Sequence, residues 1–524
     1  MTVNLSRRRT IAAAALAAGG CTAREEPITV AWVGSEPGRG HQLRRSAPLP
    51  AAAVQRRAQV LVVGAGIAGL AAARGFVQRG VDDVQLLELE DHAGGNSRGH
   101  RLGNFACPLG AHYLPLPAPE STEVAQWLHE IGLLKTQLGR TVADERHLCH
   151  SPQERVFVEG EWAEGLLPPA DPGSAAALQA GRFAQEVAKL QSGARRFALP
   201  AHRSAWSAEH ESLNRVTFAN WLTERRLDDE RLRWTLDYCC RDDYGAGAAV
   251  VSAWAGLHYF ASRHGFSAPG EAQADRDAVF TWPEGNAWLV QRLVEPLGTR
   301  LHGGRTVLRV AEQRHAVQVL AWNQSEQHVE SWTAQQIVLA MPLFVAVRVL
   351  DNPPQALRDA AKLVSYAPWL VANLQLREPL LARPGAPPSW DNVIYGSRGL
   401  GYVDAMHQSL RSHAGPTVIT AYHALEPGER AALLADDPAP WAEHVLHDLE
   451  TAHPDIRRRV QRIDLARWGH AMAVPRPGVH RHPALAALRQ QHGRVRFAHA
   501  DLAGYSVFEE AFTAGCEAAA GPLL

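Results

Sequence analysis

The sequence of 524 residues is poor in lysine and cysteine and has no excess of either charge. Its 53 basic and 54 acidic side chains nearly cancel, whereas a protein that binds a polyanion carries a basic excess, so nucleic acid is excluded as a main partner. No apolar run reaches the roughly 18 residues that span a bilayer. The hydrophobic fraction of 46% excludes disorder as the main state, and the length predicts two or three domains.

The cysteines are too few and too scattered for a disulfide scaffold or a zinc site. They are Cys21, Cys107, Cys149, Cys239, Cys240 and Cys516. None forms a Cys-x-x-Cys pair or a Cys/His ligand spacing, so the sequence predicts no metal site. We interpret the adjacent Cys239 and Cys240 as two buried thiols on a helix, with a strained vicinal disulfide as the alternative.

The N-terminus has the pattern of an export signal. Three arginines at residues 7–9 precede a short Ala-rich apolar stretch at residues 11–20. Paired arginines before a weakly hydrophobic core are typical of a twin-arginine signal. We therefore expect residues 1–21 to be an export signal and the protein to be periplasmic. The alternative is an Ala-rich disordered leader.

The end of this signal also resembles a bacterial lipoprotein cleavage site. In that reading Cys21 carries the lipid and attaches the protein to a membrane, although Ala18 stands where a larger aliphatic residue is usual. Residues 22–55 contain Pro, Gly and Arg and are expected to form a linker.

Residues 59–88 contain a complete βαβ fingerprint of a dinucleotide-binding domain. The aliphatic run at 59–63 is typical of a strand buried on both faces, residues 70–79 have helical composition, and residues 84–87 predict a second strand. The first strand runs directly into Gly64-Ala65-Gly66-Ile67-Ala68-Gly69.

Each residue type in this turn has a physical reason to be there. Gly64 allows the tight turn, Gly66 lets the backbone approach a pyrophosphate, and Gly69 lets the helix pack close to the strand. Ile67 and Ala68 open the helix, whose N-terminal amides attract phosphate. Glu88, at the end of the second strand, can accept both ribose hydroxyls of an adenosine. An acid at that position argues against a 2′-phosphate ligand.

Two segments that follow indicate the kind of dinucleotide. They are Gly94-Gly95-Asn96-Ser97-Arg98 and Leu109-Gly110-Ala111-His112-Tyr113. With them the chain resembles the flavin amine oxidase superfamily, which includes monoamine and polyamine oxidases and phytoene desaturases. The resemblance implies FAD, with Gly95, Asn96, Ser97 and Arg98 around the pyrophosphate. Asn96 stands where the family often has arginine, so the phosphate contact is expected to shift to Arg98.

The same resemblance assigns further parts of the FAD site. It places Gly110, Ala111 and His112 beside the flavin, the backbone of Val307 at the adenine edge, and Asp501 at the ribityl-phosphate part. The final helix, which contains Phe508, would point its N-terminus at the pyrimidine end of the flavin. The segment in which monoamine oxidases have the cysteine that binds flavin covalently corresponds to residues 467–478 and contains no cysteine, so noncovalent FAD is expected.

The expected fold is α/β, with a discontinuous Rossmann-type FAD-binding domain and a second, α+β substrate domain. Residues 56–115, 276–345 and 456–524 are assigned to the FAD-binding domain. Residues 116–275 and 346–455 are assigned to the substrate domain.

The usual lysine that holds a water at flavin N5 is missing. Counting back from Arg377-Glu378-Pro379 puts Val371 at its place, and the chain has only Lys135, Lys189 and Lys362. Hydride transfer to N5 needs mainly positioning and a flavin acceptor, so it is not excluded. The absence weakens the case for O2 as the fast oxidant and leaves O2 and a quinone as alternatives.

On the substrate side the sequence offers candidates of different quality. His470 and Tyr505 are the catalytic candidates, as a polar group near the isoalloxazine and as an aromatic wall, with Phe508 as a second wall residue. Asp242 and Asp243, beside Tyr244, would suit a cation, but a capped helix end with solvated charges is the preferred interpretation. The weaker aromatic candidates are His112, Tyr113, Tyr395 and Tyr402, for which core packing is preferred.

Three functions remain open at this point. The first is an exported FAD-dependent oxidoreductase that takes a hydride from a small organic substrate, by family analogy an amine or polyamine. The second is a desaturase or isomerase that acts on an apolar substrate with a quinone acceptor; a small acidic cavity would favour the amine and an apolar entrance would favour this alternative. The third is a non-catalytic FAD-binding subunit.

Overall fold

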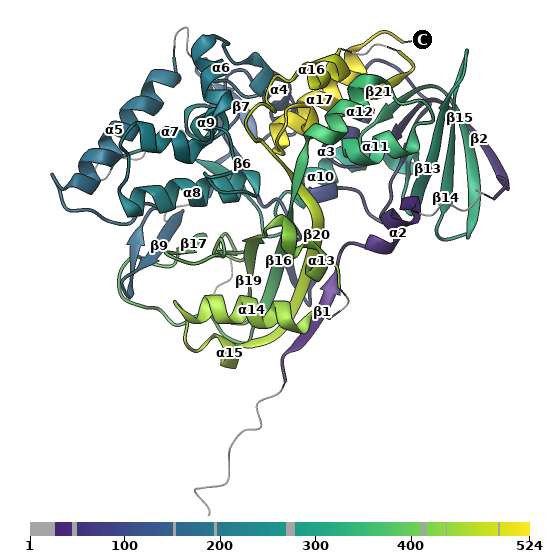
Figure 1. Ribbon diagram of the computed structural model, residues 1–524. Coiled ribbons are helices and arrows are strands. Elements are labelled where there is room, and N and C mark those ends of the chain that lie inside the picture. The colour runs from purple at the N-terminus through teal and green to yellow at the C-terminus, as the bar shows by residue number, and fades with distance from the viewer. Residues whose placement is uncertain are drawn as a thin grey trace, which may run out of the picture.

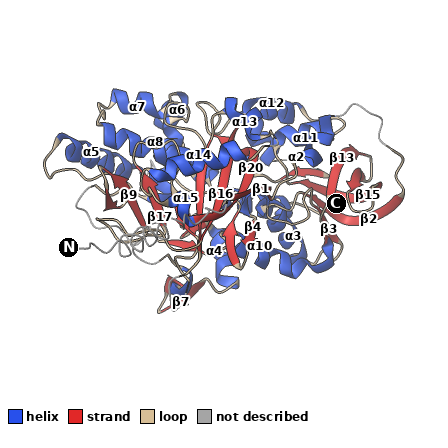
Figure 2. Cartoon of the chain, turned by 90° about the horizontal axis from the view of Figure 1, so that it is seen from below, coloured by secondary structure: helices blue, strands red, loops and turns tan. Residues whose placement is uncertain are grey.

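The structure is a computed structural model that describes residues 27–44, 50–149, 153–192, 196–268, 278–409, 415–435, 437–490 and 493–523. The expected export signal and its Cys21 lie outside these residues. None of the described helices is long and apolar enough to cross a membrane. Figures 1 and 2 show a sheet-based part at one end, a second sheet in the middle and a group of helices at the other end.

A seven-stranded sheet of the Rossmann type forms the first part. Its strand order is β12 (Leu301–His302), β3 (Val84–Leu87), β2 (Val54–Val63), β15 (His328–Leu339), β14 (Val317–Asn323) and β13 (Arg305–Glu312), and β21 (Val495–Phe497) also pairs with β15. The strands pair in parallel from β12 to β15 and at β21, whereas β13, β14 and β15 pair antiparallel. The predicted α/β class and Rossmann-type domain are confirmed.

Strand β2 is buried on both faces, as its aliphatic run predicts. Val60 and Val62 pack with α3 (Ile67–Gln78) and α17 (Phe508–Ala520). Leu61 and Val63 pack on the opposite side with α11 (Leu343–Val349), α12 (Gln355–Leu363) and α16 (Pro483–Arg489). The C-terminal helix thus completes a core that begins at residue 54, so the domain is assembled from distant stretches of the chain.

An eight-stranded sheet forms the middle of the molecule. Its order is β1 (Thr29–Val33), β20 (Val460–Val474), β16 (Ser365–Leu376), β19 (Thr417–Ala424), β18 (Tyr402–Asp404), β17 (Asp391–Ile394), β9 (Glu154–Val158) and β10 (Glu161–Glu164). β16 pairs antiparallel with β19 and β20. One face of this sheet packs against α14 (Ala439–Glu450). The opposite face packs against the helical part of the molecule, which is described next.

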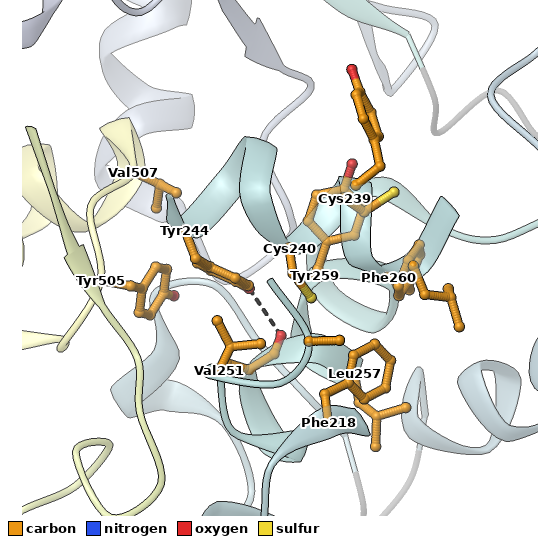
Figure 3. Close-up of a cluster of buried hydrophobic side chains, with 14 of the residues drawn as sticks. Phe218, Cys239, Cys240, Tyr244, Val251, Leu257, Tyr259, Phe260, Tyr505 and Val507 are labelled. Carbon is orange, nitrogen blue, oxygen red and sulfur yellow. Dashed lines mark hydrogen bonds between the residues drawn. The ribbon is translucent and has the colours of Figure 1, made fainter. Parts of the chain in front are cut away.

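The helical part contains α5 (Ala175–Leu190), α6 (Ala208–Arg215), α7 (Phe218–Glu224), α8 (Glu230–Tyr244) and α9 (Ala253–His258), which continues into a π-helical turn, Tyr259–His264. Figure 3 shows its core, in which the Tyr244 hydroxyl donates to the Ala255 carbonyl oxygen at 2.9 Å. Cys239 and Cys240 are buried free thiols on α8, so the preferred interpretation of this pair is confirmed.

The structure moves three of the expected domain boundaries. Residues 29–33 are not linker, because they form β1 and pair in parallel with residues 462–466 of β20. Residues 460–474 form β20, which pairs with β16 in the middle sheet rather than with the nucleotide sheet. The segment from α11 to α12 packs into the nucleotide-domain core, because Leu343, Ala346 and Leu357 are buried there.

Candidate active site

A cavity of about 620 Å³ lies where the two sheets meet α8, and its wall contains most of the residues predicted from the sequence. The predicted cofactor residues on the wall are Gly64, Gly66, Ile67, Ala68, Glu88, Gly95, Asn96, Ser97, Arg98, Gly110, Ala111, His112, Val307, Asp501 and Phe508. Gly69 is not on the wall. A Cβ atom there would lie 1.8 Å from the Gly64 carbonyl oxygen, so Gly69 serves the helix–strand packing expected of it.

The glycine turn leaves room for a phosphate group. Gly64 has φ +101°, and a Cβ atom there would meet the Ala340 carbonyl oxygen at 2.3 Å. At Gly66 a Cβ atom would have no neighbour closer than the Gly95 Cα at 4.0 Å, so it would project into the cavity. The backbone at the N-terminus of α3 is therefore open to a ligand, as pyrophosphate binding at a helix N-terminus requires. This cradle fits FAD.

Glu88 is held in place by the backbone around it. Its Oε2 accepts from the Ala65 N–H at 2.7 Å, and its Oε1 accepts from the Glu90 N–H at 2.9 Å. Burial raises the pKa of this carboxyl group. Each carboxylate oxygen can accept more than one hydrogen bond, so Glu88 can still accept the ribose hydroxyls predicted for it.

Asn96 and Arg98 already have protein partners. The Asn96 side-chain amide donates to the Ala471 carbonyl oxygen at 2.6 Å. The Arg98 guanidinium donates to the Gly34 carbonyl oxygen at 3.0 Å and lies 5.0 Å from the Trp468 ring centroid. Contact of Arg98 with the pyrophosphate stays a prediction, and the structure adds that Arg98 ties the cavity wall to the N-terminal strand.

Asp501 is fully buried on the cavity wall. Its Oδ2 accepts from the Leu343 N–H at 3.0 Å and from the Tyr366 hydroxyl. These bonds fix the carboxylate at the start of α11. Its predicted contact with the ribityl-phosphate part stays a prediction.

The two catalytic candidates lie in different surroundings. His470, on β20, is on the cavity wall, and its ring centroid lies 4.6 Å from that of Phe344. Burial, with Arg430 and Arg44 nearby, lowers the pKa of His470 to about 4, so the ring is neutral at pH 7. His470 therefore lies on the cavity wall, and its predicted role near the isoalloxazine stays a prediction.

Tyr505 is not an aromatic wall of the cavity. It is 2% exposed, its hydroxyl donates to Glu510 Oε1 at 2.7 Å, and its ring meets that of Tyr244 edge to face at 5.7 Å (Figure 3). Ser506 and Val507 line the cavity in its place. The expectation for Tyr505 is wrong because its side chain points into the helical core.

No described lysine lies on the cavity wall, and Val371 does. Val371 is 1% exposed and sits in the middle of β16. An apolar side chain therefore stands at the position that the sequence comparison gives to the missing lysine.

The acidic cluster at the end of α8 is part of the cavity wall. Asp243 pairs with Arg263 at 2.5 Å, and Arg263 pairs with Glu509 at 3.3 Å. Asp242 lines the cavity and makes no hydrogen bond or ion pair with any described residue. Burial, and then the neighbouring Asp243, raise the pKa of Asp242 to about 7. The interpretation as solvated charges is wrong, because these carboxylates face a cavity and a buried arginine.

Arg263, Trp369 and Tyr422 were not predicted as site residues, whereas His112 and Tyr113 were weaker aromatic candidates for which core packing was preferred. His112 stacks on Tyr422 at 4.4 Å, and the Tyr422 hydroxyl donates to the Gly110 carbonyl oxygen at 3.1 Å. Burial lowers the pKa of His112 to about 3. His112, Tyr113, Trp369 and Tyr422 all line the cavity. The cavity wall thus contains both carboxylates and aromatic rings.

Two weaker candidates are excluded from the cavity wall. Tyr395 packs on Trp234 at 4.8 Å, and the Tyr402 hydroxyl bonds the His453 Nε2 at 2.9 Å. Within the described residues, no group of three or more His, Cys, Asp or Glu side chains could hold a metal ion.

Comparisons with known proteins identify the family to which the chain is similar. A family model, flavin containing amine oxidoreductase, matches residues 67–521. Protein anon-37Cs of Drosophila melanogaster is 35% identical over 79 residues, which is 15% of each chain. Polyamine oxidase 7 of Oryza sativa subsp. japonica is 33% identical over 58 residues, 11% of this chain and 12% of that protein. The chain thus matches only about a seventh of the length of these curated relatives.

Solved structures resemble the chain over nearly its whole length. Putrescine oxidase bound to putrescine has a TM-score of 0.63 at 17% identity, over 89% of this chain and 99% of that chain. Cyclohexylamine oxidase from Brevibacterium oxydans has a TM-score of 0.64 at 18% identity, over 88% and 98%. A fatty acid isomerase from P. acnes has a TM-score of 0.59 at 16% identity, over 88% and 97%. At these identities the likeness shows the fold.

The first prediction tests the phosphate cradle. Gly66→Ala should leave the fold intact, since its backbone has φ −73° and the new Cβ would have no neighbour closer than the Gly95 Cα at 4.0 Å. It should weaken FAD binding by about tenfold or more, because the methyl group occupies the place of a backbone–phosphate contact worth roughly 1.5–3 kcal/mol. FAD released into the supernatant by acid precipitation measures the content and tests noncovalent binding. Gly181→Ala, in α5 with nothing within 4 Å, is the control. Equal FAD affinity in both variants would contradict the cradle.

The second prediction concerns the unpaired carboxyl group. Because the pKa of Asp242 is raised to about 7, the folded protein keeps a proton that the unfolded chain has lost above about pH 4. Wild-type stability should therefore fall, relative to Asp242→Asn, between about pH 4 and pH 7, and not further above that. Thermal unfolding across this range, with the exposed Glu230→Gln on the same helix as control, gives the comparison. Parallel curves for wild type and Asp242→Asn would show that Asp242 titrates normally.

Proposed function

The chain belongs to the flavin containing amine oxidoreductase family and is an FAD-dependent oxidoreductase; on that premise we propose that it oxidises a small amine whose ammonium group binds at Asp242. The single observation that carries this proposal is the carboxylate of Asp242, which faces the cavity without a protein partner. A partly buried carboxylate without a partner is costly to ionise, as its raised pKa indicates, unless a ligand compensates its charge. A protonated amine supplies the opposite charge and the hydrogen-bond donors.

The fold alone does not choose between an amine and an apolar substrate. Two of the similar structures are oxidases of putrescine and of cyclohexylamine, and another is a fatty acid isomerase. The carboxylate of Asp242 on the cavity wall favours the amine, because an apolar substrate would leave it desolvated and unpaired. The rings of Tyr113, Trp369 and Tyr422 suit the carbon chain and the cation alike.

Each group of this chain has a distinct part in the proposed reaction. FAD, when bound, supplies the two-electron acceptor for a hydride from the substrate carbon next to nitrogen. The amine must be neutral at that moment, and Asp242 is placed to hold the ammonium and to take its proton at a carboxylate oxygen. The chain of ion pairs Asp243–Arg263–Glu509 keeps Asp243 ionised and engaged, which leaves Asp242 to the substrate.

We also propose a quinone rather than O2 as the faster electron acceptor. The support is Val371 on the cavity wall, because its apolar side chain cannot hold a water molecule at the flavin as the family's lysine does. Stopped-flow mixing of the reduced protein with air-saturated buffer or with a soluble quinone distinguishes the two.

The proposal includes the location of the protein. Export by the twin-arginine route suits a protein that must fold around FAD before it leaves the cytoplasm, and residues 7–9 carry that pattern. Lipidation of Cys21 would then attach it to the membrane on the periplasmic side. Mass spectrometry of the mature N-terminus distinguishes a lipid-modified Cys21 from an unmodified chain.

The third prediction tests substrate recognition. Asp242→Asn should raise the amine concentration that gives half-maximal anaerobic reduction by about 10- to 100-fold, since a hydrogen bond to a charged group contributes roughly 1.5–3 kcal/mol. Glu230→Gln makes the same chemical change on α8 outside the cavity and should behave as wild type. Unchanged amine dependence in Asp242→Asn would remove the ammonium site. If dithionite bleaches the wild-type flavin but no amine does, the amine proposal is wrong, and the apolar-substrate and non-catalytic alternatives remain.

A further inference from the structure

The segment that follows β1 crosses the cofactor cavity. We call residues 34–44 the strap; they include α2 (Pro37–His41) and a short 3-10 helix, Gln42–Arg44. Figure 1 shows β1 at the edge of the middle sheet beside β20, and α2 between it and the nucleotide domain. The strap lies before residues 67–521, the part of the chain that the family model matches.

The strap forms part of the cavity wall. Its residues on the wall are Ser35, Glu36, Pro37, Gly40, His41, Leu43 and Arg44. Leu43 packs against the nucleotide-domain core, against which Phe344 and Val345 of α11 also pack. The same wall contains the glycine turn at Gly64 and Gly66, so the strap borders the cavity in which the cofactor phosphates are predicted to lie.

One end of the strap is fixed to the middle sheet. β1 pairs with β20 from Thr29 to Val33, and the Ser35 hydroxyl donates to the Arg467 carbonyl oxygen at 2.8 Å. The carbonyl oxygen of Gly34 accepts from Arg98 at 3.0 Å. This end continues from β1, whose backbone pairs with β20 from Thr29 to Val33.

The middle of the strap is held by a clasp to the nucleotide domain, formed by Glu36 and Arg39. Arg39 donates to both carboxylate oxygens of Asp91, at 2.9 Å each, and to the Leu89 carbonyl oxygen at 3.1 Å. The Glu36 N–H donates to Glu90 Oε1 at 3.1 Å. The hydrogen bond from Arg39 lowers the pKa of Asp91, as expected for an ionised partner. The clasp partners come directly after Glu88, the predicted ribose ligand.

The strap also brings positive charge to the cavity. Arg44 lies on the wall with Arg348 of α11, and neither forms a hydrogen bond or ion pair with any described residue. A dinucleotide carries two phosphates, which such cations attract.

We propose that the strap is a cover that retains the cofactor: closed by the Arg39–Asp91 clasp, it encloses the dinucleotide, and it must open for FAD to enter or leave. The clasp, and not the strand pairing of β1, is the part that opens, because side-chain bonds at a half-exposed site are weaker than a paired strand. The proposal rests on FAD binding in this cavity and does not depend on which substrate the protein oxidises.

The fourth prediction measures the clasp. Arg39→Ala should speed the release of FAD, followed by the rise in free-flavin fluorescence after dilution, by about fivefold, because an exposed bidentate pair contributes up to about 1 kcal/mol. Arg309→Ala breaks a bidentate pair with Asp351 away from the cavity and should release FAD at the wild-type rate. The charge exchange Arg39→Asp with Asp91→Arg should return the rate to within about twofold of wild type.

A second measurement does not depend on the clasp variants. Trypsin should cut after Arg44 more slowly in the FAD-loaded protein than in the FAD-free protein, because the cofactor holds the strap closed. Cleavage after Arg140, in the hairpin of β7 (Leu134–Gln137) and β8 (Arg140–Ala143), should be equal in both. Equal cutting after Arg44 with and without FAD, or an unchanged release rate in Arg39→Ala, would overturn the strap proposal while leaving the oxidase proposal intact. If the protein binds FAD but its flavin accepts no electrons from amines, the oxidase proposal is wrong and the strap proposal is unaffected.

Discussion

The cavity depends on backbone segments that touch one another without side chains between them. The turn after β2 lies against the strand end at Ala340, α3 lies against that turn at Gly69, and α17 lies against α3 at Gly515. A Cβ atom at Gly515 would lie 2.1 Å from the Ala68 carbonyl oxygen. These contacts bring the start, the middle and the end of the chain together around the cavity. The packing that forms the core of the nucleotide domain therefore also forms the cofactor site.

The charges of the site follow from that packing. The first turn of α17 brings Glu509 and Glu510 into the interior, where Arg263 meets Glu509 and the Tyr505 hydroxyl meets Glu510. Since Arg263 also binds Asp243, every carboxylate of this group has a partner except Asp242, which faces the cavity. Buried charges are tolerated when they are paired. Asp242 is the carboxylate left without a protein partner, and the proposed amine substrate supplies the positive charge that would pair with it.

The sequence predicts the parts of this site that are local. The βαβ unit from residue 59 to Glu88 has its strand, turn and helix signals within 30 residues, and the structure agrees. The direction of a single side chain is different: Tyr505 follows Gly504, which has φ +87°, and the turn there sends the tyrosine into the core and Val507 to the cavity. No periodicity carries that information.

Long-range pairing also escaped the sequence. Residues 29–33 read as linker because Pro and Gly surround them, yet they gain backbone partners from β20, more than 400 residues later. Arg263 lies in a π-helical turn, and its role appears only when α8 and α17 meet. The family resemblance predicts FAD correctly. The carboxylates on the cavity wall could not be predicted in the same way, because their arrangement depends on the packing of α8, the π-helical turn and α17.

The central claim is that a neutral amine gives up a hydride after losing its proton in this cavity. The most direct test is the rate of anaerobic flavin bleaching by putrescine and by cyclohexylamine as a function of pH. The account predicts a rate that rises from about pH 6 to about pH 10, because the neutral fraction of an amine with a pKa near that of lysine rises over this range. A flat profile, or no bleaching by any amine while dithionite reduces the flavin, would contradict it.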